Sequence, residues 1–217
     1  MKLRIFELPP IGTNAYLLID EEEGNAALFD APYGASDEVD RQLERFNAKL
    51  EGVWLTHGHW DHILDVHRFN AKDVPVWAHE ADSFLIQHPE SMMDYMIPGI
   101  QLHPGKIDRF AEEGSVLTIL GHEVEVRHVP GHSQGSVAYV FGNGGFVISG
   151  DVVFAGSVGR TDLPGCDHET LMRSIRTQIL TLDDSFVIYP GHGPRTTVAH
   201  ERALNPFLQG FGRYGTR

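Results

Sequence analysis

The chain has 217 residues, a formal net charge of −13, and a composition of 41% apolar and 22% charged residues. Such a composition supports a sizeable core and excludes a disordered chain. The negative charge opposes binding to nucleic acid phosphates, and no run of Lys and Arg offsets it.

The first part of the chain alternates predicted strands and helices. Strands are expected at 14–19 and 26–29, separated by a solvated turn. Ser36 is expected to cap a helix whose apolar stripe is formed by Val39, Leu43, Phe46 and Leu50. The elements expected next are a strand at 52–56, a helix at 63–69, a strand at 74–77 and a helix at 81–87.

The segment 88–110 has no regular periodicity. Its apolar side chains stand among prolines and glycines, and they are Met92, Met93, Tyr95, Met96 and Ile97. We interpret the segment as a loop or lid with an apolar face. Ordinary packing of these side chains under a long loop is an equal alternative.

The sequence pattern of the remainder of the chain predicts two hairpins, a helix, a strand and a final helix. The hairpins pair 116–120 with 123–128 and 137–141 with 146–149. Asp167 is expected to cap a helix with apolar positions Leu171, Ile175, Ile179 and Leu182; a strand at 186–189 and a helix at 196–204 follow. No linker interrupts the pattern, so we expect one α/β domain over residues 1–217. Two packed sheets with outer helices would suit it, although periodicity alone does not select this layering.

Four potential metal ligands lie close together after the strand predicted at 52–56. The sequence there is Thr56-His57-Gly58-His59-Trp60-Asp61-His62. Strand residues two apart point to one face, so His57 and His59 can converge as the strand ends, and Asp61 and His62 enter the following helix. A solvated polar loop would explain one lone histidine. Four such groups after an apolar strand favour a metal site, because burying them together without a metal is costly.

Three further candidate ligands each stand where a predicted strand ends, flanked by glycine. They are His132, Asp151 and His192. Taken singly, each is more typical of a cap or turn. Together with the first four they form a set of nitrogen and oxygen donors. Such a set suits zinc, and also iron or manganese.

In this order, the motifs resemble those of the metallo-β-lactamase superfamily over essentially the full length of the chain. The resemblance implies a four-layer αβ/βα sandwich with the site at the edge where its two sheets meet. It also implies two divalent metal ions. One would lie on His57, His59 and His132, the second on Asp61, His62 and His192, with Asp151 bridging them and Asp30 steadying the ligand loop.

Two segments narrow the resemblance to one branch of the superfamily. Thr13-Asn14-Ala15-Tyr16 and the Gly-Arg-Thr-Asp sequence ending at Asp162 are similar to segments of type II glyoxalases, especially short bacterial ones, and of persulfide dioxygenases. We therefore treat Arg160, Thr161 and Asp162 as candidate substrate-binding residues. An internal ion pair between Arg160 and Asp162 that only shapes the loop is at least as good an interpretation.

The resemblance implies a metal-dependent hydrolase in which a metal-bound hydroxide attacks a carbonyl and Asp61 orients the hydroxide. A thioester such as S-lactoylglutathione is the expected substrate, because a thiolate leaves readily. The alternative is a mononuclear iron persulfide dioxygenase using His57, His132 and Asp151. A non-catalytic metal-binding protein is a third hypothesis. Longer type II glyoxalases hold glutathione with a C-terminal helical domain, whereas this chain ends at 210–217, which leaves glutathione binding open.

Further features bear on compartment and partners. The single cysteine, Cys166, allows no intrachain disulfide and favours a reducing compartment. The first residues lack an apolar signal core, and no stretch approaches the roughly 18 apolar residues of a membrane span. We expect a cytoplasmic protein with a small-molecule substrate, no nucleic acid or membrane partner, and a homo-oligomer as an open alternative.

Overall fold

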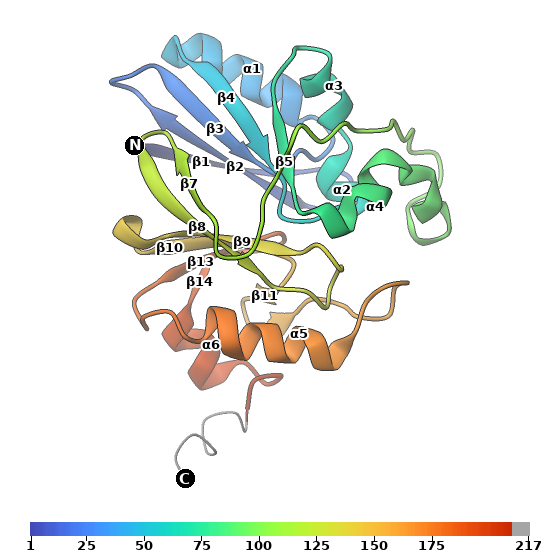
Figure 1. Cartoon of the computed structure of the whole chain (residues 1–217), viewed down its shortest axis with the longest axis vertical. Coiled ribbons are helices and arrows are strands. Elements are labelled where there is room, and N and C mark those ends of the chain that lie inside the picture. Colours follow the sequence, from blue (N-terminus) through green and yellow to red (C-terminus); the bar gives the residue numbers. More distant parts are fainter. Residues whose placement is uncertain (210–217) are drawn as a thin grey trace.

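Two six-stranded sheets pack face to face, with helices on their outer faces, in a computed structural model that describes residues 1–209 (Figure 1). The first sheet has the order β1-β2-β3-β4-β5-β6. Its strands are β1 (Lys2–Leu8), β2 (Thr13–Asp20), β3 (Asn25–Phe29), β4 (Lys49–Trp54), β5 (Val76–Ala78) and β6 (Arg109–Phe110). The first three strands pair antiparallel, and β3 to β6 pair parallel.

The second sheet has the order β14-β13-β10-β9-β8-β7. Its strands are β7 (Val116–Ile119), β8 (His122–His128), β9 (Val137–Phe141), β10 (Phe146–Gly150), β13 (Val187–Pro190) and β14 (Thr196–Thr197). Only β10 and β13 pair parallel. A separate ribbon is formed by β11 (Val153–Phe154) and β12 (Ser157–Val158).

Helices cover the outer faces of both sheets (Figure 1). Those beside the first sheet are α1 (Ala35–Phe46), α2 (Trp60–Ile63), α3 (Val66–Asn70) and α4 (Ser83–Gln87), with single 3-10 segments η1 (Glu80–Asp82) and η2 (Pro89–Tyr95). Those beside the second sheet are α5 (His168–Ser174), continued by the π-helical η4 (Ile175–Ile179), and α6 (Val198–Leu204); η3 (Gly142–Gly144) closes the β9–β10 hairpin. None of the helices in the described part of the chain has the length and apolar character of a membrane span.

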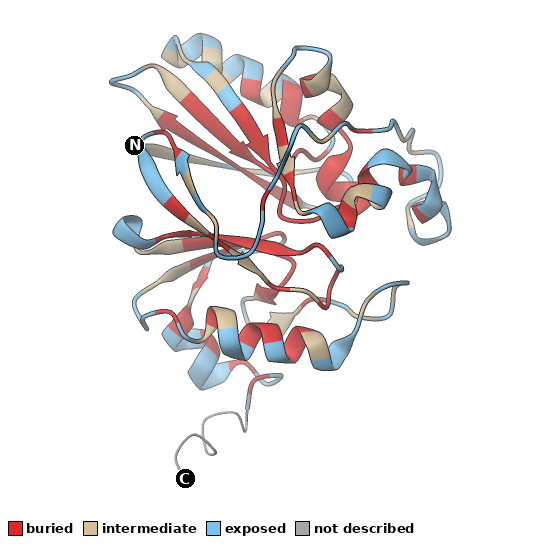
Figure 2. Ribbon diagram, in the orientation of Figure 1, coloured by how far each residue is buried: buried red, intermediate tan, exposed pale blue. Residues whose placement is uncertain are grey.

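Three apolar clusters match the layers of the sandwich. The middle cluster lies between the two sheets and contains large side chains such as Tyr16, Phe29 and Tyr139. The other two lie between each sheet and its own helices, around Leu28 and Val39 and around Ile175 and Ile188 respectively. Figure 2 shows the buried residues along the strands and on the inner sides of the helices. Because every sheet face is covered, the expected αβ/βα sandwich is confirmed.

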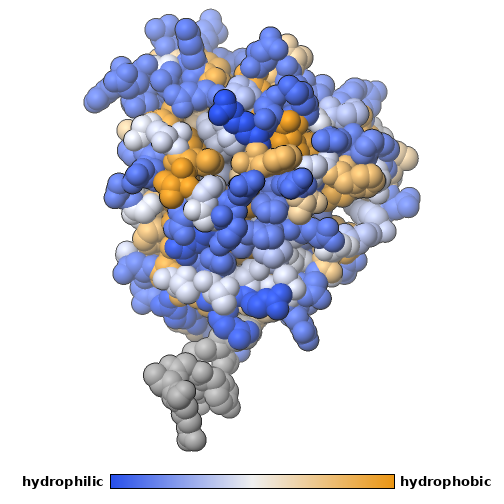
Figure 3. Space-filling view, viewed as in Figure 1, coloured by the Kyte–Doolittle hydropathy of each residue, from blue (hydrophilic) through white to orange (hydrophobic). Residues whose placement is uncertain are grey.

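Hydrophilic side chains cover most of the face shown in Figure 3, and hydrophobic ones form small patches between them. A single domain over residues 1–217 stays a prediction, and the chain end at 210–217 lies outside the described residues.

Several predicted boundaries in the first sheet and its helices are wrong. Gly34, in the left-handed conformation at φ 88°, precedes the first helical residue of α1, and Ser36 lies buried inside the helix instead of capping it. The helix ends at Phe46 because Asn47 also turns left-handed, with φ 47°. Leu50 consequently belongs to β4.

Other predicted elements are shifted or divided. The helix expected at 63–69 is divided into α2 and α3, and the one expected at 81–87 begins as a 3-10 turn. The final helix begins at Val198, because 196–197 pairs with β13 as β14. The cap at Asp167 is confirmed, since its side chain accepts a hydrogen bond from the N–H of Thr170. The N-terminal strand β1 was missed by the sequence analysis.

Backbone hydrogen bonds join the two sheets at the edge from which the candidate ligand loops emerge. The N–H of Asn14 in β2 donates to the carbonyl oxygen of Gly191 after β13, at 2.7 Å. The N–H of Val137 in β9 donates to the carbonyl oxygen of Thr56 after β4, at 2.8 Å. The sandwich therefore fixes the segments after β4 and β13 relative to each other.

Candidate metal centre

The structure brings all seven candidate ligands together at this edge. Three overlapping groups have their ligand atoms within 4.8 Å of one another. They are His57, His59 and His132; His57, His62 and Asp151; and Asp61, His62 and His192. All but His192 are buried. Residues spread over the chain from 57 to 192 thus form one compact polar cluster.

The cluster is assembled from loops of both sheets and the first turn of a helix. The strand β4 ends at Trp54, so His57 and His59 lie in the loop after it and not on the strand itself. Their rings still converge, with centroids 4.8 Å apart. Asp61 lies in α2, as the sequence predicted. The second sheet supplies His132 between β8 and β9, Asp151 directly after β10, and His192 two residues after the end of β13.

Hydrogen bonds on the outer side of the cluster orient the imidazole rings. Nδ1 of His62 lies 2.9 Å from Oδ2 of Asp30. Nδ1 of His132 donates to the carbonyl oxygen of Arg160 at 2.8 Å, and Nδ1 of His192 donates to the carbonyl oxygen of Gly12 at 3.2 Å. These contacts hold Nδ1 of each ring on the outer side and turn Nε2 toward the cluster, as is usual for metal-ligating histidines. The expected supporting position of Asp30 is present in the structure.

The first histidine pair presents different nitrogens to the interior. Nδ1 of His57 lies 3.1 Å from the hydroxyl oxygen of Thr56, so its Nε2 faces the cluster. His59 instead turns its Nδ1 inward, 2.8 Å from Nε2 of His132. Three nitrogens from separate residues therefore meet in one small volume, as a tetrahedral metal with one further position requires.

Unpaired buried atoms provide a test of whether metal ions fit. Among the described residues, Nε2 of His57, Nε2 of His62 and Oδ1 of Asp151 are buried without a hydrogen bond, and the last two atoms lie 3.3 Å apart as an ion pair. Leaving buried polar atoms unpaired is costly, so a cation between them would satisfy the group. Gly191 keeps the space open, because a Cβ there would lie 1.9 Å from Oδ1 of Asp151. The residues fit divalent metal ions.

The ionisation of the cluster differs between its two sides. Burial, followed by the neighbouring imidazoles, lowers the pKa of His57 far below its usual value and that of His59 to about 3. Burial also lowers the pKa of His192, but hydrogen bonds to Asp151 and Asp61 outweigh it and raise the value to about 10. His57 and His59 are thus neutral and ready to bind a cation, whereas a cation near His192 must displace a proton.

Thr13 is a residue of the site to which the sequence analysis gave no role. Its hydroxyl donates to Oδ2 of Asp61 at 2.7 Å, and the side chain is fully buried. Its backbone forms an isolated bridge to His192. The side-chain amide of the adjacent Asn14 donates hydrogen bonds to the carbonyl oxygens of Pro190 and Gly193. The Thr-Asn-Ala-Tyr segment therefore holds the His192 turn and the Asp61 carboxylate together.

Asp82 was also missed. Its buried carboxylate accepts hydrogen bonds from the N–H groups of Gly58 and Gly135 and from the hydroxyl of Ser133, at 2.7–2.8 Å. It consequently ties the loop after β4 to the loop that carries His132. In the sequence it stands among residues typical of a helix start, and no motif marks it.

Comparison with known proteins agrees with this geometry. The family model of the metallo-beta-lactamase superfamily matches residues 8–192. The chain belongs to the metallo-β-lactamase superfamily. It is 36% identical over 212 residues to hydroxyacylglutathione hydrolase GloC of Haemophilus influenzae, covering 96% of this chain and 98% of that one.

Solved structures of the superfamily also match. BLEG-1, a B3 metallo-beta-lactamase, has a TM-score of 0.88 and 36% identity, covering 96% of this chain and 100% of that one. TTHA1623, solved in a di-iron-bound form, has a TM-score of 0.79 and 34% identity, covering 94% and 100% respectively. The superfamily and its fold are thereby shown. The identity of the metal is not shown, since one of these relatives holds iron.

A cleft of about 650 Å³, called the metal cleft below, opens onto five of the candidate ligands: His59, Asp61, His132, Asp151 and His192. Arg160 lines it, and its guanidinium donates to both carboxylate oxygens of Asp162, at 2.7 and 2.8 Å. The expected internal ion pair is therefore present. Thr161 and Asp162 do not line the cleft. Contact of Arg160, Thr161 or Asp162 with a substrate stays a prediction.

The segment 88–110 forms part of this cleft. Met92 is buried in the core, whereas Met93 is exposed to solvent. Tyr95, Met96 and Ile97 line the metal cleft. Both interpretations of the segment thus hold for different side chains, with one methionine packed in the core and an apolar face beside the ligands.

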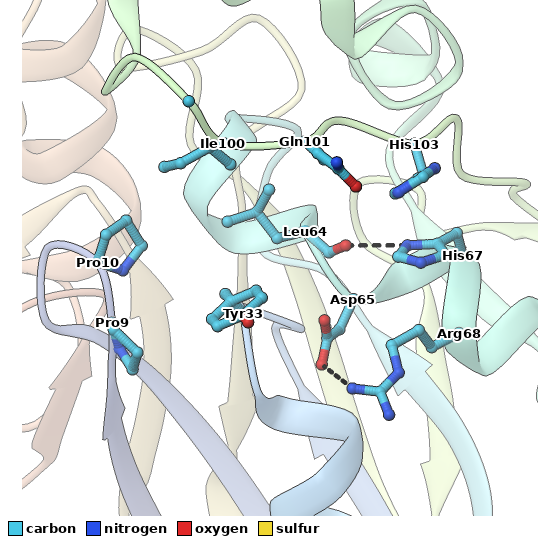
Figure 4. Close-up of a pocket in the computed structure, with 11 residues that line it drawn as sticks. Pro9, Pro10, Tyr33, Leu64, Asp65, His67, Arg68, Ile100, Gln101 and His103 are labelled. Atoms are coloured by element: carbon cyan, nitrogen blue, oxygen red, sulfur yellow. Dashed lines mark hydrogen bonds and ion pairs between the residues drawn. The ribbon is translucent and has the colours of Figure 1, made fainter.

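A second hollow of about 470 Å³, the Tyr33 pocket, lies beside the metal cleft (Figure 4). The two share a margin, because Pro10 and Gly99 line the pocket while the adjoining Ile11 and Pro98 line the cleft. Figure 4 shows Tyr33 and Leu64 between the two prolines on one side and two histidines on the other. Two charged side chains line the pocket, and Oδ2 of Asp65 lies 3.5 Å from Nη1 of Arg68.

Proposed function

We propose that the chain is a two-metal hydrolase that cleaves a thioester. As a member of a metallo-hydrolase superfamily, it has a cluster that can hold divalent ions. The observation that carries the proposal is the presence of both triads around Asp151. One triad would hold an ion on His57, His59 and His132, and the other would hold a second ion on Asp61, His62 and His192.

Bound divalent ions would supply a Lewis acid for a carbonyl oxygen and would lower the pKa of a shared water. Asp61 contributes the orientation of that water, because its carboxylate faces the cluster and can accept the hydrogen bond. Thr13 holds this carboxylate by donating to Oδ2 at 2.7 Å. In our proposal no Ser or Cys nucleophile takes part.

Two observations support a thioester. One relative, similar over nearly its whole length, is named as a hydrolase of hydroxyacylglutathione. The Arg160–Asp162 pair is the structural form of the Gly-Arg-Thr-Asp segment that resembles type II glyoxalases. A thiol is also a good leaving group, since its usual pKa is about 8.5.

An iron persulfide dioxygenase remains the second candidate function. His57, His132 and Asp151 lie in the same cluster, and a 34% identical relative has been solved with two iron ions. This candidate predicts iron and oxygen uptake with a persulfide. The thioesterase proposal predicts thiol release without oxygen.

Asp61→Ala tests the assigned role. We expect turnover of S-lactoylglutathione or a simpler thioester to fall at least about a hundredfold, as for loss of a general acid–base group. Elemental analysis should still find metal, because His57, His59 and His132 are intact. Asp94→Ala, at an exposed carboxylate outside the cleft, is the matched control and should behave as wild type. Unchanged turnover in Asp61→Ala would contradict the assignment. Oxygen-dependent turnover by the iron-loaded wild type would favour the second candidate.

A further inference from the structure

We infer that the metal cleft selects a substrate whose group beside the reacting carbonyl is apolar and uncharged, and that a glutathione conjugate is not its preferred ligand. The inference rests on the proposed function, since it names the substrate class of the same site. It comes from the walls of the cleft and not from the ligands.

Apolar side chains from several separate segments line the metal cleft beside the candidate ligands. Ile11 comes from the β1–β2 loop, Met96 and Ile97 from the segment after η2, Phe154 from β11, and Leu163 from the loop before α5. These side chains come from both halves of the sandwich. A wall built from so many separate segments is a property of the folded cleft and not of one stray residue.

Part of this wall is exposed where burial would be favourable. Ile11 is 46% exposed, Tyr95 is 47% exposed and Ile97 is 41% exposed. Single exposed apolar residues need no explanation, but apolar residues gathered around one cleft mark a binding site. A ligand with an alkyl or aryl group would cover them and gain the free energy of removing that area from water.

Among the described residues, the walls carry no Lys or Arg that is free of a carboxylate partner. Arg160 is the one Lys or Arg among the described residues that line the cleft, and both oxygens of the Asp162 carboxylate engage it. In the adjoining Tyr33 pocket, the one Arg among the lining residues, Arg68, is also paired with carboxylates. Arg68 donates to both carboxylate oxygens of Asp37 and lies beside the carboxylate of Asp65, which Figure 4 shows.

These ion pairs disfavour an anionic ligand. Glutathione carries two carboxylates, and a site that binds them needs cations that are not already neutralised. If Arg160 turned toward a ligand carboxylate, Asp162 would stay beside it as a like charge. The net charge of −13 acts in the same direction over longer distances. A neutral thioester or ester with an apolar acyl or thiol group meets neither obstacle.

Binding of non-hydrolysable thioethers tests the inference independently of turnover. We would measure, by calorimetry on the metal-loaded protein, the Kd of S-hexyl-N-acetylcysteamine, S-methyl-N-acetylcysteamine and S-hexylglutathione. The hexyl ligand should bind tighter than the methyl ligand by at least about fourfold for each buried methylene. The neutral hexyl ligand should also bind at least about tenfold tighter than S-hexylglutathione. Equal or tighter binding of S-hexylglutathione overturns the inference, and so does indifference to chain length.

A charge placed in the wall provides a second, matched test. Ile97→Lys adds a cation at a lining position, and Met93→Lys adds one nearby on η2 at an exposed position that does not line the cleft. Ile97→Lys should weaken binding of the neutral hexyl ligand at least about threefold and shift preference toward S-hexylglutathione. Met93→Lys should leave both unchanged. An equal effect of the two variants would show that only overall charge matters and would overturn the inference.

Turnover separates failure of the inference from failure of the proposed function. If acyl-N-acetylcysteamine thioesters are cleaved faster as the acyl chain grows, both are supported. Cleavage that favours S-lactoylglutathione supports the function and contradicts the inference. No cleavage of any thioester, together with the expected order of thioether binding, contradicts the function and leaves the apolar selectivity supported.

Discussion

Thr13 shows how a residue outside the proposed ligand set can position one of its members. Its hydroxyl is the hydrogen-bond donor to Oδ2 of Asp61, and the same Oδ2 lies 3.2 Å from Nε2 of His192. The Asp61 carboxylate is thus held between the neutral hydroxyl of Thr13 and the imidazole of His192, whose pKa it helps to raise. We regard Thr13 as a positioning residue for Asp61.

Thr13→Val removes the hydroxyl and keeps the shape of the side chain. We expect kcat to fall about ten- to hundredfold, which corresponds to a lost hydrogen bond to a charged group. Metal content should stay at the wild-type value, because every proposed ligand remains. Thr13→Ser should restore most of the activity. Steady-state kinetics with elemental analysis would contradict this account if the valine variant were fully active or if serine failed to rescue it.

The seven clustered side chains could be predicted from sequence because their signal is local. Four stand between positions 57 and 62, and His132, Asp151 and His192 each follow a predicted strand. Thr13 and Asp82 could not be assigned in this way. Their hydrogen bonds reach across 48 residues from Thr13 to Asp61 and 53 residues from Asp82 to Gly135, and no local pattern records such distances.

At the scale of elements, the segments near the cluster are short and depend on their caps. The 3-10 turn η1 begins after His79, whose Nδ1 accepts a hydrogen bond from the N–H of Ala81 at 3.2 Å. Its ring stacks on His128, with centroids 4.1 Å apart. This turn carries Asp82, which holds both ligand loops. The neutral form of His79 is therefore part of the support of the site.

The cap at His79 predicts a loss of stability in mild acid. Burial, and then the charge of His128, lower the pKa of His79 below its usual 6.5. As pH falls through about 6.5, the unfolded chain takes up a proton that the folded chain resists, so this contribution to stability is present above that pH and lost below it. His79→Asn keeps a capping oxygen and does not titrate.

Chemical denaturation of wild type and His79→Asn between pH 7.5 and 5.5 measures this effect. The wild type should lose more unfolding free energy than the variant over this interval. Parallel pH profiles of the two proteins would contradict the role of the neutral cap.

The boundaries missed from sequence are also local conformations that tertiary contacts decide. Asn47 adopts a left-handed conformation that ends α1, and β4 begins two residues later at Lys49. Leu50 therefore lies in β4, although its spacing fits the apolar stripe of the helix. Ser36 is of a residue type that is favoured at N-caps, but it lies inside the helix, where its N–H donates to Oδ2 of the buried Asp65. Strand β1 lies at an edge of the sheet, and none of its residues is fully buried, so it lacks the buried apolar run that marks the inner strands.

At the scale of the whole molecule, the cluster exists only when the sandwich is complete. His57 and Asp61 belong to the first sheet and its helices, whereas His132, Asp151 and His192 come from the second. The layer order could be anticipated only through the resemblance, since periodicity left other α/β layerings open. Metal binding should therefore be coupled to folding of both halves.

Zinc should stabilise the whole chain. Ligand at about a hundred times its Kd adds about 2.7 kcal/mol to the free energy of unfolding. For a protein of this size, that corresponds to an increase in Tm of about 5–10 °C over the chelator-treated form. Differential scanning calorimetry with and without zinc measures the shift. Asp151→Ala should show a smaller one, and an equal shift in that variant would point to zinc bound elsewhere.

The central claim is that these seven side chains form one two-metal site. Elemental analysis after dialysis against zinc, on wild type and on Asp151→Ala, tests it most directly. We predict about two ions per wild-type chain and at least one fewer in the variant, because Asp151 belongs to the middle of the cluster. A wild type with less than one ion per chain, or a variant that retains as much metal as the wild type, would contradict the account.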